Sequence, residues 1–152
     1  MKTTKQFLLT VLSGILLMLM STAGVPAQTQ PSAGDGSVAN PYRIGTADEF
    51  RWWVNHVNGG NTTASARLTA DITFTNMTVN PTDGTVTNRQ TTQTVPTITQ
   101  YEGTFDGGGH CLSGLCLNSH LNTLFRLIGP AATVKNLYLR NVLTVSTFTG
   151  IL

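Results

Sequence analysis

The architecture is predicted by the segment Leu112-Ser113-Gly114-Leu115-Cys116-Leu117, whose apolar spacing returns later in the chain in Val134-Lys135-Asn136-Leu137-Tyr138-Leu139. Both segments follow the form L-x-x-L-x-L, and its apolar positions are Leu112, Leu115 and Leu117 in the first copy and Val134, Leu137 and Leu139 in the second. The second copy begins 22 residues after the first. An apolar pattern that recurs at a fixed period in this range is typical of a solenoid.

Two solenoids compete for this pattern. A leucine-rich repeat would place Asn or Cys three residues beyond the last leucine of each copy, but His120 and Val142 occupy those positions. No strong helix-forming segment separates the two copies either. We therefore predict a mainly β chain, a parallel β-helix with coils of about 22 residues, in which the two apolar triplets stack on each other inside.

A glycine-rich corner precedes the first copy, in Phe105-Asp106-Gly107-Gly108-Gly109-His110. The glycines permit positive φ and a sharp turn between strands, and Asp106 is expected to accept hydrogen bonds from backbone amides two residues further on. The alternative is a calcium or phosphate site. Calcium takes about six to eight oxygen ligands, and only Asp106 and Glu102 lie nearby, so we favour the structural role and predict no metal site.

An amphipathic helix is predicted over residues 46–58. Thr46 and Glu49 form the two ends of a capping box. Apolar residues follow at helical spacing, and the stop signal is glycine, in the order Phe50, Trp53, Val54, Val57, Gly59 and Gly60. We expect this helix to cover the open N-terminal end of the β-helix. Trp52 lies off the centre of the apolar stripe, so it either packs at the rim or is an exposed aromatic for a sugar ring.

Other segments complete the predicted domain. Tyr42–Ile44 and residues 66–74 alternate apolar with polar side chains and are predicted strands, the second a single one with one buried face. Residues 28–40 have no hydrophobic period and are predicted to be a flexible leader to a domain spanning residues 41–152. Residues 75–93 are mostly polar and are predicted to be a long exposed excursion.

The N-terminal segment, residues 1–27, has the order of a secretory signal peptide. Met1–Lys5 carries two lysines, residues 7–20 are apolar, and small residues follow, with cleavage expected after Ala27 or, second, after Ala23. The apolar run is about 14 residues, shorter than the roughly 20 that cross a bilayer, so no transmembrane anchor is predicted. The protein is expected to be exported to the cell surface, the extracellular space or the periplasm.

Charge identifies no partner at this stage. Nine basic residues face seven acidic ones, and removal of Lys2 and Lys5 with the leader would leave the chain formally neutral. The remaining basic residues are scattered in sequence, so no nucleic-acid surface is predicted; they are Arg43, Arg51, Arg67, Arg89, Arg126, Lys135 and Arg140. Cys111 and Cys116 would lie on opposite faces of a continuous strand and are expected to be free thiols, unless a turn between them permits a disulfide.

The segment Tyr101-Glu102-Gly103-Thr104-Phe105-Asp106-Gly107-Gly108-Gly109-His110-Cys111-Leu112-Ser113-Gly114-Leu115 resembles the region that precedes GLUG repeats in secreted surface proteins of Bacteroides-type gut bacteria. Residues 36–44, 46–58, 68–72 and 128–137 fit the same resemblance in the same order. The resemblance implies a right-handed β-helix on exported, often adhesin-like proteins, with no catalytic residues shared by the family.

The chain departs from that pattern in two places. Thr123 and Arg126 stand where relatives have glycines of a G-L-F-G-x-I-G segment. The sequence also stops where relatives would enter their glycine-rich repeats, and an apolar Ile151-Leu152 end is a poor cap for a solenoid. We therefore expect a β-helix domain truncated at its C-terminus.

A structural or binding role is predicted over catalysis. A β-helix polysaccharide lyase or glycosidase is the alternative, but only Asp71, Glu102 and Asp106 could supply its carboxylates, and no spacing among them is diagnostic. His56, His110 and His120 show no metal-ligand spacing, and no cofactor is predicted. A nonfunctional remnant of a longer adhesin is a third hypothesis.

Solenoids bind through extended faces. Contacts to a host or bacterial surface glycan or protein are therefore expected from residues 75–100 and from outward side chains, with Trp52, Arg126, Tyr138 and Arg140 as the candidates. The sequence does not predict the oligomeric state.

Overall fold

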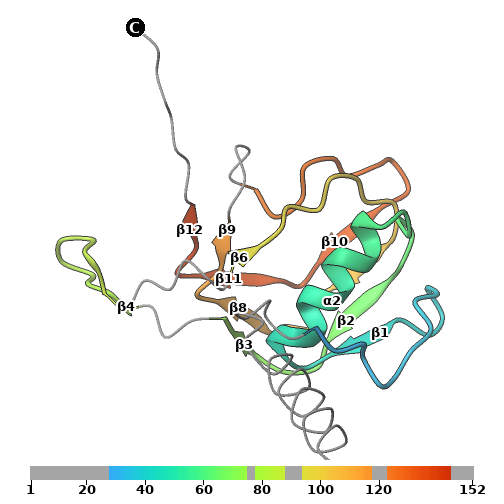
Figure 1. Ribbon diagram of the computed structural model, residues 1–152, viewed down its shortest axis with the longest axis horizontal. Coiled ribbons are helices and arrows are strands. Elements are labelled where there is room, and N and C mark those ends of the chain that lie inside the picture. The colour runs from blue at the N-terminus through green and yellow to red at the C-terminus, as the bar shows by residue number, and fades with distance from the viewer. Residues whose placement is uncertain (1–27, 75–77, 88–93, 118–122, 145–152) are drawn as a thin grey trace, which may run out of the picture.

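A computed structural model describes residues 28–74, 78–87, 94–117 and 123–144 of the 152-residue chain. The predicted signal peptide, the C-terminal residues 145–152 and parts of the predicted excursion lie outside the described residues. Within the described parts the chain is mainly strands with one helix, and its sheets are parallel apart from one hairpin (Figure 1). No helix in those parts has the length and apolar character that crossing a bilayer requires.

The elements follow one another in short pieces. They are β1 (Tyr42–Ile44), α2 (Ala47–Asn58), β2 (Ala66–Leu68), β3 (Ile72–Thr73), β4 (Thr78–Val79), β5 (Val86–Thr87), β6 (Thr94–Val95), β7 (Thr104–Asp106), β8 (Cys111–Ser113), β9 (Cys116–Leu117), β10 (Thr133–Lys135), β11 (Tyr138–Arg140) and β12 (Leu143–Thr144).

The chain passes through the same three parallel sheets again and again. The sheets have the strand orders β1-β2-β7-β10, β11-β8-β3 and β12-β9-β6. Each of the successive strand sets β2-β3-β6, β7-β8-β9 and β10-β11-β12 therefore visits all three sheets once, in the same order. Between β3 and β6 the chain leaves this path to form the antiparallel hairpin β4-β5, whose turn residues 80–85 are exposed and project away from the sheets (Figure 1).

The predicted register of the two apolar triplets is wrong. Leu112 pairs with Leu139 and not with Val134. Val134 pairs with Phe105 instead, at a different offset along the sequence. The repeat has no fixed period because the corner between β7 and β8 contains residues 107–110, whereas the corner between β10 and β11 contains only residues 136–137. Each strand set has several apolar positions. The two copies of L-x-x-L-x-L therefore match in spacing, although their equivalent residues do not pair with each other in the sheets.

Left-handed residues form the corners. Gly108 and Gly109 have φ of 61° and 81° between β7 and β8, and Asn136 has φ of 53° between β10 and β11. Asparagine also replaces glycine at the next pair of corners. Gly114 has φ of 70° between β8 and β9, and Asn141 has φ of 50° between β11 and β12. Asparagine tolerates this region better than other residues with a Cβ, so the corners keep their geometry without glycine.

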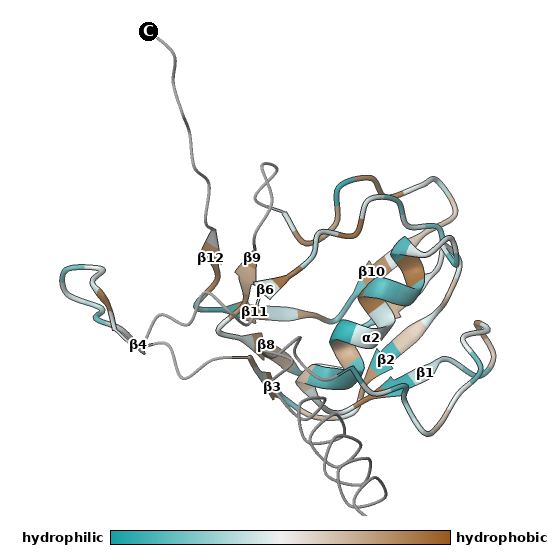
Figure 2. Cartoon of the chain, viewed as in Figure 1, coloured by the Kyte–Doolittle hydropathy of each residue, from teal (hydrophilic) through white to brown (hydrophobic). Residues whose placement is uncertain are grey.

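The capping box of α2 is confirmed. The Thr46 hydroxyl accepts a hydrogen bond from the Glu49 N–H at 3.2 Å, and the Glu49 carboxylate accepts from the Thr46 N–H at 3.1 Å. The helix ends at Asn58, and the glycine with positive φ is Gly60, at 109°. The helix carries both hydrophilic and hydrophobic residues (Figure 2), and its buried apolar residues Phe50, Trp53, Val54 and Val57 recur at helical spacing, which gives it one apolar face.

That face of α2 closes one side of the core. Its buried residues share a single apolar cluster with inward side chains of the sheets, and this cluster includes Phe50, Trp53, Val54, Val57, Ile72, Phe74, Phe105, Leu112 and Leu115. The Trp53 ring lies 4.8 Å from the Phe105 ring, centroid to centroid. The Trp53 Nε1–H donates to the Ala64 carbonyl at 3.0 Å, so the indole is buried without an unsatisfied donor.

Two other segments differ from their predicted form. The predicted strand over residues 66–74 is two strands, because a corner at residues 69–71 separates β2 from β3. Residues 28–40, predicted to be a flexible leader, bond to the domain: the Arg43 N–H donates to the Ala33 carbonyl at 3.0 Å, and the Ser65 N–H donates to the Gly36 carbonyl at 2.7 Å.

Candidate functional site

Four charged residues form one row across the outer face of the first sheet. The parallel register aligns Arg43 of β1 with Arg67 of β2, Arg67 with Asp106 of β7, and Asp106 with Lys135 of β10. Arg43 and Arg67 each lie between two buried residues of a three-residue strand, so their side chains point outward. Neighbouring strands are about 4.8 Å apart, which makes this a closely spaced row of charges.

The Asp106 side chain is hydrogen-bonded within the corner that follows it and to Asn136. Its Oδ1 accepts hydrogen bonds from the Gly108 N–H at 2.9 Å and from the Asn136 Nδ2 at 3.0 Å, and its Oδ2 lies 3.9 Å from the Lys135 Nζ. The Gly108 N–H above all, and then Asn136 and the charges of Lys135 and Arg67, hold the pKa of Asp106 below its usual range. The predicted bond from Asp106 to the backbone two residues on is therefore confirmed.

Arg43 and Arg67 have no such partner in the described parts of the chain, where neither guanidinium makes an ion pair. They line a groove of about 500 Å³ together with residues of the preceding loop, of the β2 end and of the glycine corner, which are Ala39, Pro41, Leu68, Thr69 and His110. Two like charges directly opposite each other on neighbouring strands repel. The described lining of the groove contains both guanidinium groups and no carboxylate, so the groove is basic.

His110 reaches this groove from the corner between β7 and β8. Its Nδ1 lies 3.2 Å from the Asp71 Oδ1, which also accepts from the Cys111 N–H at 3.0 Å. These contacts, the Cys111 N–H first, lower the pKa of Asp71. The contact with Asp71 orients the ring through Nδ1, which leaves Nε2 as the nitrogen that a ligand can use. The pair is solvated, because the Asp71 side chain is 74% exposed and the His110 side chain 36%.

The glycines of this corner let it approach the neighbouring strands closely. A Cβ on Gly108 would lie 2.8 Å from the Leu68 carbonyl oxygen and 3.5 Å from the Arg67 Nε. A Cβ on Gly107 would lie 2.3 Å from the Asn136 carbonyl oxygen, in the next strand set. The corner therefore packs tightly against both neighbouring strand sets, which side chains would prevent.

A second hollow of about 290 Å³ continues along the row. It shares Pro41 and Arg67 with the first groove, and its other lining residues are Val38, Ser65, Ala66, Thr104, Asp106 and Lys135. Arg67 therefore stands between the two hollows. The second one contains the Asp106 carboxylate beside Arg67 and Lys135, whereas the described lining of the first groove contains basic residues and no carboxylate.

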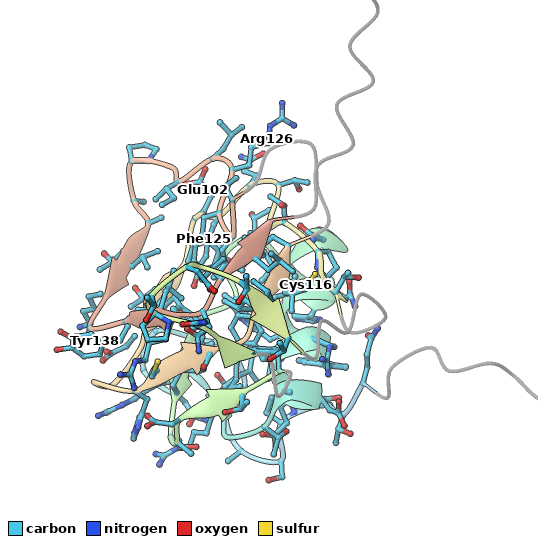
Figure 3. The ribbon with its side chains drawn as sticks, turned by 90° about the vertical axis from the view of Figure 1, so that its left-hand side faces the viewer. Glu102, Cys116, Phe125, Arg126 and Tyr138 are labelled. Carbon is cyan, nitrogen blue, oxygen red and sulfur yellow. The ribbon has the colours of Figure 1, made fainter. Side chains whose placement is uncertain are left out.

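The predicted binding residues do not converge on this groove. Trp52 is half-buried and stacks on His56, with 4.7 Å between ring centroids and 12° between planes, so it packs at the rim. Arg126 and Tyr138 are exposed but lie far apart (Figure 3). Tyr138 and Arg140 share the outer face of β11, and Arg140 is close enough to Asp71 to help lower its pKa.

The three carboxylates considered for catalysis are held separately. Asp71 bonds to His110 and Cys111, Asp106 bonds to the corner, and Glu102 accepts from the Gln100 Nε2 at 3.3 Å. Among the described residues no three His, Cys, Asp or Glu side chains gather as metal ligands would.

Neither Cys111 nor Cys116 forms a disulfide. They belong to β8 and β9, and the corner at Gly114 separates these strands, so the two cysteines do not share a continuous strand.

Sequence reasoning missed the Arg43–Arg67 pair. The basic residues are scattered along the chain, and the whole of α2 lies between these two arginines in the sequence. The only signal in the sequence is that both occupy the polar centre of a short apolar-polar-apolar strand, Tyr42–Ile44 and Ala66–Leu68. That they meet follows from the parallel pairing of β1 with β2.

No protein-family model matches the chain, and neither does any curated protein or solved structure. The resemblance to the region that precedes GLUG repeats therefore stays a prediction. Functional inference for this chain depends on its own geometry.

Proposed function

We propose that this chain is an exported, adhesin-like surface module, built as a right-handed parallel β-helix, whose role is to present a binding face. Three observations support the architecture: the repeated passage through three parallel sheets, the left-handed corners, and the single apolar interior closed by α2. The leader-like character of residues 1–27 supports export.

One observation carries the binding role. The parallel register converts residues that are distant in sequence into a continuous outer row, and this row borders the basic groove at Arg43 and Arg67. Solenoids bind through such extended faces. Arg67 gains some attraction from Asp106, but Arg43 pairs in register only with Arg67, and the repulsion between the two arginines opposes folding. This favours a role in recognition over a structural role.

A polysaccharide lyase is the second candidate, because His110 and Asp71 lie beside the same arginines. A lyase needs a base to remove a proton and a cation to hold the uronate, and His110 Nε2 with Arg43 or Arg67 would supply both. Solvation weakens this candidate, because Asp71 is largely exposed and water competes for its bond to His110. A binding role without turnover is therefore favoured.

Screening the purified protein against a panel of bacterial and host polysaccharides separates these roles. We expect a glycan to bind while the products show neither new reducing ends nor unsaturated sugars. Unsaturated products that disappear in His110→Ala would overturn the binding module in favour of the lyase. A folded protein that binds neither glycans nor cell surfaces would support a nonfunctional remnant.

A further inference from the structure

We infer that the groove at Arg43 and Arg67 binds a singly charged anionic group of a polysaccharide, the carboxylate of a uronic acid or a sulfate ester. This inference depends on the proposed binding role and specifies its ligand class. It goes beyond the predicted binding residues, none of which lines the groove.

The charges of the groove select an anion. Arg43 and Arg67 face each other in the register of β1 and β2, and an anion between them would relieve their mutual repulsion. Guanidinium groups offer planar pairs of N–H donors, which match the oxygens of a carboxylate or a sulfate. His110 adds a third nitrogen at the side of the groove.

The shape of the groove selects a group carried on a polymer. The lining is mostly polar and contains two exposed arginines, so the groove cannot bury a small apolar molecule. Pro41 and Ala39 provide a small apolar wall against which the face of a sugar ring can pack. The Thr69 hydroxyl is already used, because it donates to the Ile44 carbonyl at 3.2 Å. Recognition therefore depends on the arginines.

The neighbouring carboxylates argue against nucleic acid. Asp106 follows Arg67 in the row, and Asp71 contacts His110, which lines the groove. Duplex DNA carries a charge about every 1.7 Å along its axis, so its backbone would lie over these carboxylates as well as over the arginines. A polysaccharide with one anionic group per sugar can place that group between the two arginines and keep its neutral parts near Asp106 and Asp71.

The test measures affinity for four polymers at low salt: heparin as the sulfated glycan, polygalacturonate as the uronate polymer, dextran as the neutral glycan, and duplex DNA. We expect heparin, polygalacturonate or both to bind, with an affinity that falls as salt is added, and dextran and DNA to bind at least tenfold more weakly. Which of the two anionic polymers binds more tightly identifies the anionic group.

Variants locate the site. Arg43→Gln with Arg67→Gln should weaken binding of the anionic polymer at least tenfold. The matched control Gln30→Glu with Ser32→Glu changes the net charge by the same amount at exposed positions outside both hollows, and it should change binding less than twofold. Arg67→Lys keeps the charge but loses the planar fork, so it should fall between the two. Both arginines are exposed, and circular dichroism with thermal melting checks that each variant stays folded.

Several results would overturn the inference. Equal losses in the matched control and in the double arginine variant would mean that general charge attracts the polymer, and comparable binding of DNA would mean the same. Tight binding of dextran that the double variant retains would remove the anion site but leave the proposed binding module standing. Failure of every glycan on the wider panel would remove both.

Discussion

Gly107→Ala tests whether successive strand sets contact each other as closely as the fold requires. A Cβ at this position would lie 2.3 Å from the Asn136 carbonyl oxygen and 2.6 Å from the Leu137 Cα, where ordinary contacts begin at 3.4 Å. The obstacle is backbone, so the corner between β10 and β11 would have to move by about 1 Å. That movement stretches the bond from the Gly107 N–H to the Lys135 carbonyl, now 2.8 Å.

The expected loss is about 3 kcal/mol in the free energy of unfolding. Overpacking costs about 1–3 kcal/mol, and the weakened hydrogen bond adds about 1 kcal/mol. Gly109→Ala is the matched control two residues away. No atom lies within 4 Å of a Cβ there, and the cost is only that of alanine at φ of 81°, about 1 kcal/mol. The two variants should therefore differ by about 2 kcal/mol.

Urea denaturation followed by circular dichroism measures this difference. With a slope of about 2 kcal/mol per molar urea, the midpoint of Gly107→Ala should lie about 1 M below that of Gly109→Ala. Equal midpoints for the two variants would show that the strand sets do not approach each other at Gly107. The pairing of β7 with β10 would then be wrong, and with it the row of charges that depends on this pairing.

Three further predictions concern the cap, the core and the response to acid. Thr46→Ala should lower the free energy of unfolding by about 1 kcal/mol in urea titrations, because the Glu49 N–H loses its acceptor. Leu112→Ala should lower it by about 3 kcal/mol, since this side chain is fully buried between Ile72 and Leu139; a loss under about 1 kcal/mol would contradict that packing. The pKa of Asp106 is lower in the folded chain than in the unfolded one, so its contribution to stability is complete above about pH 4 and is lost as the pH falls further. Asp106→Asn should therefore flatten the acid side of the stability profile, and an unchanged profile would contradict the assigned bonds.

Local signals in the sequence predicted the local structure. The capping box needs only Thr46 and Glu49, three residues apart, and the corner bond needs only Asp106 and Gly108. Both are confirmed because their partners are close in sequence, so no tertiary information is required. The stacking of Trp52 on His56 was missed, although four residues on a helix place two rings on the same side.

Pairing between strand sets could not be predicted in the same way. Its register depends on how many residues each corner and insertion contain, and nothing periodic sets those numbers. The offset from Phe105 to Val134 differs from that between Leu112 and Leu139 because the corner at residues 107–110 is longer than the corner at residues 136–137. A single apolar spacing therefore selected a plausible but wrong alignment.

The same variation in corner length determines where the candidate site lies. The corners between the first two sheets contain residues 69–71, then 107–110, then 136–137, while the strands that they connect keep their parallel pairing. The longest corner is the one that contributes His110 to the groove beside Arg67. Strand pairing thus fixes the row of outward charges, and corner length is free to vary without disturbing it. A recognition site can change at the corners of this fold while the apolar interior stays the same.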